Sequence, residues 1–134
     1  MVRGDELWFY YTGLKYRVRP EKADPDTGAI CLAVLRRDGF ISLDGGQEAG
    51  TLLTEPFKMP GARLFVNVDA PRGGIRVEML DEGGKVMAAS ASIKGDHLAA
   101  EVIWENGEFA QAQDRQVRLR FTLANGQFYS YWVE

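Results

Sequence analysis

Short runs in which every second residue is apolar dominate the chain. Residues 63–69 place Leu64, Val66 and Val68 at alternate positions, and residues 74–79 and 116–123 follow the same rule. Successive side chains of a strand point to opposite faces, so this alternation predicts strands with one buried and one solvated face. Such strands are typical of antiparallel sheets.

Turn-forming residues separate these runs. Hairpin turns are predicted at three places, because glycine and asparagine accept the backbone angles of tight turns. They are residues 70–74, residues 81–85 and the pair Asn125 and Gly126. Residues 37–40 predict a further turn. The remaining expected strands lie at residues 7–11, 29–35, 40–43, 51–57, 85–90, 98–104 and 128–133, of which 29–35 is apolar throughout and is expected to be buried.

About nine or ten short strands with glycine-rich turns predict an all-β fold, an antiparallel β-sandwich or jelly roll. Residues 1–134 are expected to form a single domain, since 134 residues and 15.0 kDa suit one core. Residues 15–28 carry two prolines and many charges, and they predict a loop that is either a linker or a ligand-facing segment.

Composition narrows the function classes. A net charge of −3 argues against nucleic acid as a partner. The single cysteine, Cys31, excludes an intrachain disulfide and a cysteine-based zinc cluster. No apolar run approaches the roughly 18 residues of a membrane span, and the first residues lack the apolar segment of a signal peptide. We therefore expect a soluble globular domain with no membrane partner, and its localisation stays open.

Two segments carry a resemblance to a known family. Residues 28–44 and 115–132 resemble the C-terminal β-sandwich of bacterial glycosidase-like proteins that begin with a five-bladed β-propeller. That architecture is similar to glycoside hydrolase families 32 and 43. Residues 4–13 resemble the last propeller strand, which implies that residues 1–14 are the remnant of a missing propeller. The catalytic residues of such families come from the propeller, and their motifs do not occur in this chain.

Exposed aromatic rings are the first candidates for ligand binding, because a ring stacks on the apolar face of a sugar. The candidates include Trp8, Tyr10, Trp104, Tyr129, Tyr131 and Trp132. Alternation along the last strand places Phe128 and Trp132 on one face and Tyr129 and Tyr131 on the other. If the first face belongs to the core, Tyr129 and Tyr131 form an exposed pair. The alternative is that these rings fill the core or once packed against the propeller.

Arg118 and Arg120 are the second group of candidates. Both point to the outer face of the expected strand, where two guanidinium groups suit an acidic polysaccharide. The alternative is a set of ordinary cross-strand ion pairs with Glu78 and Glu101.

An enzymatic function would need other residues. Glycoside hydrolysis uses two carboxylates, for which Glu101, Asp38 and Asp44 are the candidates. His97 is the only histidine, and a triad with Ser90 or Ser92 lacks the nucleophile-elbow motif.

Calcium is the one metal that the sequence suggests, through Asp24 and Asp26. Their D-x-D-x-G pattern is a fragment of an acidic calcium loop, but Leu35 stands where such a loop has its bidentate glutamate. The alternative is an ordinary Asx turn, in which an aspartate side chain hydrogen-bonds to the nearby backbone. We expect no other cofactor.

Together these patterns predict a noncatalytic accessory β-sandwich module of a glycoside-hydrolase-like protein that binds a polysaccharide or oligosaccharide through exposed aromatics. The alternatives are a small β-sandwich glycoside hydrolase and a purely structural domain. The orphaned aromatic strand at residues 7–11 also predicts a homodimer, because an apolar strand edge tends to pair with another chain.

Overall fold

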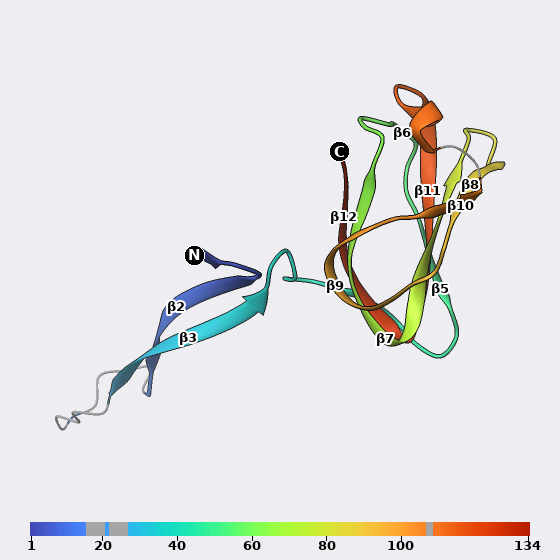
Figure 1. Ribbon diagram of the computed structural model, residues 1–134. Coiled ribbons are helices and arrows are strands. Elements are labelled where there is room, and N and C mark those ends of the chain that lie inside the picture. Colours follow the sequence, from blue (N-terminus) through green and yellow to red (C-terminus); the bar gives the residue numbers. More distant parts are fainter. Residues whose placement is uncertain (16–20, 22–26, 107–108) are drawn as a thin grey trace. The chain divides into compact units, whose positions relative to one another are not determined.

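The computed structural model describes residues 1–15, 21, 27–106 and 109–134. Asp24 and Asp26 lie outside the described residues. The chain forms two compact units, Met1–Phe40 and Ile41–Glu134 (Figure 1). The sequence predicted one sandwich over the whole chain. Instead, the strands of the first unit pair only with one another, so that the sandwich belongs to the second unit.

The first unit is a small antiparallel sheet in the order β1-β2-β3, with β1 at Val2–Arg3, β2 at Glu6–Leu14 and β3 at Gly28–Arg36. The strands β2 and β3 pair along their whole length, with Tyr10 opposite Leu32. Both strands were predicted. The expected burial of β3 is wrong, because Ile30 is 82% exposed and most other residues of the strand are exposed as well.

The second unit is an antiparallel β-sandwich, as predicted. Its strands are β4 (Leu43–Gly45), β5 (Gly50–Leu53), β6 (Phe57–Lys58), β7 (Leu64–Leu80), β8 (Val86–Ser90), β9 (Ile93–Glu101), β10 (Trp104–Asn106), β11 (Gln116–Ala124) and β12 (Gly126–Val133), with a 3-10 turn at Phe109–Ala112. The described residues thus hold twelve strands, more than expected, mainly because β1, β4, β6 and β10 are too short to show an alternation.

The strand β7 takes part in both layers of the sandwich. Its residues 64–69 pair with β12, and its residues 74–80 pair with β11. The strand β9 pairs along the first part and β8 along the second. The hairpin predicted at residues 70–74 is therefore wrong. The chain bends there and continues, because Gly73 lets it pass so close to Ala124 that a Cβ would overlap the Ala124 carbonyl oxygen.

The turn at Asn125 also differs from the prediction. Asn125 has a φ of 45°, as a tight turn requires, but β11 and β12 pair with opposite ends of β7 rather than with each other. The turn thus joins the two layers and closes no hairpin. The turn at residues 81–85 is a true hairpin, since the Asp81 amide donates to the Lys85 carbonyl oxygen at 3.0 Å and Leu80 lies opposite Val86.

The predicted alternation describes the core well. The inward residues of β7 and β11 are at most 6% exposed, namely Leu64, Val66, Val68, Ile75, Val77, Met79, Val117, Leu119, Phe121 and Leu123. Within the described part of the chain, no helix has the length and apolar character needed to cross a membrane.

The bend in β7 gives a stability prediction. Replacing Gly73 with alanine forces a methyl group onto the Ala124 carbonyl, and we expect the free energy of unfolding to fall by about 1–3 kcal/mol, the usual cost of overpacking. Gly46→Ala is the matched control, because its Cβ would meet no atom within 4 Å. Urea unfolding followed by circular dichroism measures both. Equal midpoints for the two variants would contradict the role assigned to Gly73.

Candidate functional site

A row of polar side chains crosses four neighbouring strands of one layer. Asp44 on β4 lies opposite Gln127 on β12, Gln127 lies opposite Asp69 on β7, and Asp69 lies opposite Asp96 on β9. Residues that lie directly opposite each other in antiparallel strands share a face of the sheet. With strands about 4.8 Å apart, the row is roughly 14 Å long.

The row lies on the outer face of this layer. Val68 and Phe128, the chain neighbours of Asp69 and Gln127, are 0% and 5% exposed in the core. Because successive residues of a strand alternate between faces, Asp69 and Gln127 point outward. Within the row, Asp69 and Asp96 lie directly opposite each other, and like charges in that position oppose the stability of a sheet.

A polar pocket lies at the β4 end of this row. It has a volume of about 380 Å³ and is lined by Asp44, Gly45, Asp69, Pro71, Arg72, Asn125, Gly126 and Gln127. The Asp44 carboxylate accepts hydrogen bonds from the Ser42 hydroxyl at 2.6 Å and from the Gln127 amide at 3.4 Å. Two carboxylates, two amides and the Arg72 guanidinium thus surround one hollow, a mixture of donors and acceptors that suits a ligand with several hydroxyl groups.

Aromatic and charged side chains gather further along the same outer face. Trp132 stacks on Phe65, with ring centroids 5.5 Å apart and planes 11° apart. The Arg63 guanidinium lies 4.8 Å from the centroid of the Phe65 ring and donates to both carboxylate oxygens of Glu101, at 3.0 and 2.7 Å. This hydrogen-bonded pair holds the pKa of Glu101 below its ordinary value and raises the pKa of Arg63.

A β-bulge decides which rings of β12 face outward. The register with β7 shifts between Phe128 and Ser130, so Phe128 and Tyr131 both point into the core. Tyr131 packs 5.0 Å from Phe121, and Trp132 faces outward in its place. The exposed pair of Tyr129 and Tyr131 that strict alternation predicted is therefore wrong. Tyr129, at the bulge, is half-buried and donates its hydroxyl to the Gln127 side chain at 2.8 Å.

Trp8 and Tyr10 lie on the sheet of the first unit. Their ring centroids are 6.3 Å apart, and Tyr10 is 58% exposed. The Arg3 guanidinium lies 4.4 Å from the centroid of the Trp8 ring, and the Trp8 indole donates to Glu6 at 2.8 Å. The guanidinium thus occupies a face of the Trp8 ring, which leaves Tyr10 as the more accessible ring of the two.

The other predicted binding residues have structural partners. Trp104 stacks on the buried Phe109 with centroids 4.7 Å apart and packs against the core. Arg118 donates to the Thr54 carbonyl oxygen at 3.0 Å. Arg120 donates to Glu78 at 2.6 Å, the cross-strand pair that was the alternative to polysaccharide binding, and this contact raises the pKa of Arg120.

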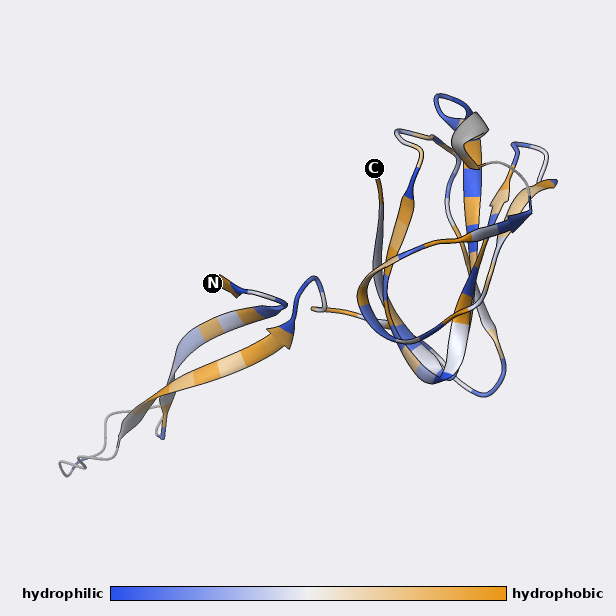
Figure 2. Cartoon of the chain, viewed as in Figure 1, coloured by the Kyte–Doolittle hydropathy of each residue, from blue (hydrophilic) through white to orange (hydrophobic). Residues whose placement is uncertain are grey.

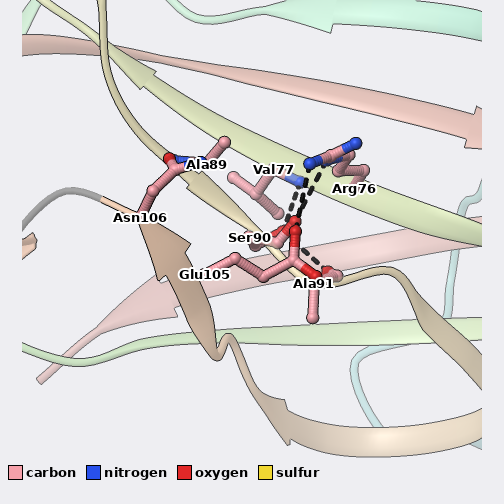
Figure 3. Close-up of polar contacts among 7 residues, drawn as sticks. All are labelled: Arg76, Val77, Ala89, Ser90, Ala91, Glu105 and Asn106. Atoms are coloured by element: carbon pink, nitrogen blue, oxygen red, sulfur yellow. Dashed lines mark hydrogen bonds and ion pairs between the residues drawn. The ribbon is translucent and has the colours of Figure 1, made fainter.

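The serine–histidine alternative has no support in the geometry. Ser90 is fully buried, and its hydroxyl accepts from the Val77 amide and donates to the Ala91 carbonyl oxygen, both at 2.8 Å (Figure 3). The Arg76 guanidinium bridges the Ser90 carbonyl oxygen and Glu105 in the same cluster (Figure 3). His97 lies within β9, where its Nε2 is 2.7 Å from the Lys94 carbonyl oxygen. Ser90 therefore ties strands together.

The three candidate catalytic carboxylates have different surroundings. Asp38 lies in the turn after β3, with a φ of 54°, and Arg37 is 3.9 Å away. Glu101 is paired with Arg63, and Asp44 alone lines the polar pocket, beside Asp69. Among the described residues, no group of three or more His, Cys, Asp or Glu side chains is placed to hold a metal ion.

A second hollow, of about 280 Å³, opens between the edge strands β4 and β5. Its walls are mostly apolar and include Leu43, Leu52, Phe121, Leu123 and Phe128. Core side chains thus reach the surface where the two layers do not meet.

Comparisons with models of protein families, with curated proteins and with solved structures find no match to this chain.

Sequence reasoning missed most of the outer-face site. Asp44 was singled out, but Gln127, Asp69, Asp96 and Arg72 come together only through the register of four strands. No sequence spacing encodes that register, because the strands are far apart along the chain. Trp132 was one of the candidate rings, but strict alternation placed it on the same face as the core residue Phe128, and only the bulge after Phe128 turns it outward.

The Arg63–Glu101 pair gives a prediction on pH dependence. In Arg63→Met the pKa of Glu101 is expected to rise to its ordinary range, because its hydrogen-bonded partner is lost. A carboxylate with a lowered pKa in the folded state stabilises the fold above its unfolded-state pKa, and this contribution disappears as the pH falls through the folded pKa. The wild type should therefore exceed the variant in stability at neutral pH, and the difference should vanish in acid.

An NMR titration of the glutamate carboxyl carbons, with urea unfolding at several pH values, measures both effects. Lys58→Met, which removes an exposed ion pair with Asp114, is the control and should leave the Glu101 titration unchanged. A stability difference that is independent of pH would mean that Arg63 acts through its contact with Phe65 instead.

Proposed function

We propose that this chain is a noncatalytic accessory module of a glycoside-hydrolase-like protein, and that its sandwich binds a polysaccharide or oligosaccharide. The observation that carries the proposal is the row of Asp44, Gln127 and Asp69 beside the polar pocket. Carboxylates and amides on adjacent strands offer hydrogen-bond acceptors and donors at the spacing of a sheet, which suits the closely spaced hydroxyl groups of a sugar chain.

The aromatic end of the same face extends the proposed site. Trp132 lies on the same outer face as the row, and Tyr129 donates to Gln127, so rings and polar groups belong to one surface. A ring that stacks on the apolar face of one sugar, next to acceptors for the hydroxyls of another, is the usual composition of a carbohydrate site. The proposal thus moves the aromatic contribution from Tyr131 to Trp132.

A glycoside hydrolase is the second candidate, because the pocket holds two carboxylates. Asp44 and Asp69 lie on strands that flank β12, so their backbones are roughly 10 Å apart. An inverting hydrolase needs carboxyl groups about 6.5–9.5 Å apart. Release of sugar from a polysaccharide distinguishes the two functions.

The test is affinity electrophoresis against soluble β-glucans, xylans, mannans, fructans and pectins, with released reducing sugar assayed in parallel. Retarded migration without release is expected for the accessory module. Release that is abolished in Asp44→Asn and Asp69→Asn would replace it with the hydrolase. No retardation and no release with any polysaccharide would favour the purely structural domain.

Variants of the protein then show which of its residues bind the glycan identified in this way. We expect Asp69→Ala to weaken binding about 10- to 100-fold, because a hydrogen bond to a charged group contributes about 1.5–3 kcal/mol. Trp132→Ala should weaken binding through lost stacking. Glu82→Ala, which removes one carboxylate from the distant turn between β7 and β8, is the charge-matched control and should bind as the wild type does.

Tyr10→Ala tests the aromatic candidate of the first unit. Isothermal titration with the retarded glycan measures all four variants, and circular dichroism checks their fold. A loss of affinity in Tyr10→Ala, with Asp69→Ala unaffected, would place the site on the first unit and overturn the assignment to the outer face of the sandwich.

A further inference from the structure

The sheet of the first unit is apolar on both of its faces. Opposite residues of β2 and β3 share a face, and one face carries Trp8 with Val34 and Tyr10 with Leu32. The other face carries Leu7 with Leu35 and Phe9 with Ala33. The apolar colours extend along nearly all of β3 (Figure 2). A hairpin in water normally keeps one polar face, so this pattern is that of a strand pair within a larger sheet.

Large side chains on this sheet remain open to solvent. Ile30 is 82% exposed, Val34 is 45% exposed and Leu32 is 41% exposed. The third strand of this sheet, β1, has only two residues, so most of the unit is a two-stranded hairpin, which is marginally stable in water by itself. Additional strands along its edge would therefore stabilise the first unit.

The outer edge of β3 is open for such a strand. On its other side β3 pairs with β2, and the described residues contain no further partner for it. The outer edge of β2 is less available, because β1 pairs with Glu6 and Leu7 and the Trp8 amide donates to the Met1 carbonyl oxygen at 2.8 Å. Residues 29–35 contain no charge and no proline, the features with which proteins normally protect an edge.

The sequence of β3 is complementary to itself. An antiparallel copy centred on Leu32 places Ile30 opposite Val34, Cys31 opposite Ala33 and Leu32 opposite Leu32. The apolar residues meet one another, and each Arg36 falls opposite Gly28 of the other copy, so the two arginines lie at opposite ends. The sequence numbers of opposite residues differ by an even number, so partners share a face and both faces of the hairpin continue into the second copy.

We propose that two copies of this chain associate through the edges of β3, as antiparallel strands about a two-fold axis at Leu32. The product is a sheet in the order β2-β3-β3-β2, and the partner is a second copy of this chain. The prediction from sequence placed a dimer at residues 7–11. The structure favours β3 instead, since β1 already occupies one end of the β2 edge.

Disulfide trapping tests the register. In a Cys31→Ala background, Leu32→Cys places two thiols opposite each other at a Cα separation of about 4.5–5.5 Å, which a disulfide spans. Ala29→Cys in the same background is the matched control, because its two copies would be six residues apart along the strands, roughly 20 Å. We expect a covalent dimer under mild oxidation for Leu32→Cys and at least a tenfold slower reaction for Ala29→Cys.

The mass in solution tests the association itself. Light scattering over a concentration series should give twice the 15.0 kDa chain mass for the wild type. Leu32→Lys should raise the dimer dissociation constant at least tenfold, since it places two like charges opposite each other. Ile103→Lys, at a residue 63% exposed on the second unit, is the control and should remain dimeric.

A wild type that is monomeric at every concentration overturns the proposal and indicates that the hairpin is covered by its own chain or by a different protein. A dimer that persists in Leu32→Lys, or equal trapping rates at positions 29 and 32, overturns the β3 register. None of these measurements depends on a glycan, so they stand apart from the proposed function.

Discussion

The passage of one strand through both layers is the constraint on which the sandwich depends. The first part of β7 pairs with β12 and β9, and its second part pairs with β11 and β8, so this strand sets the register of four others. Gly73 permits the bend between the two parts, because any Cβ there would overlap the backbone at Ala124. The strands β11 and β12, although consecutive, therefore lie in different layers.

The outer-face site follows from that register. Because β12 and β9 pair with the same part of β7, side chains distant in sequence meet in one row beside the polar pocket. The like charges of Asp69 and Asp96 on neighbouring strands oppose the stability of the sheet, whereas the Arg63–Glu101 and Arg120–Glu78 pairs support it.

The first unit poses a different physical problem. Its strands pair in full register, but both faces carry large apolar side chains, and the edge of β3 has no charged residue between Ala29 and Leu35. In the proposed dimer, a second copy of β3 hydrogen-bonds to the open edge of the first and leaves both faces of the sheet unchanged. The proposed self-association and the proposed glycan binding thus use different units of the chain, the β3 edge in the first and the outer face of the sandwich in the second.

The sequence by itself determined the elements and most of the core. Alternation in residues 74–79 and 116–123 specified which side chains are buried, because the period of a strand is a local property of the backbone. In residues 63–69, neighbouring parts of the chain also cover Phe65 and Asn67 on the face that was expected to be solvated. The tertiary structure decided what local patterns do not contain. Residues 70–74 have the composition of a turn but continue a strand, and the bulge after Phe128 exchanges Tyr131 for Trp132 on the outer face. The row from Asp44 to Asp96 depends on pairings between strands distant in sequence, which only the packing of both layers fixes.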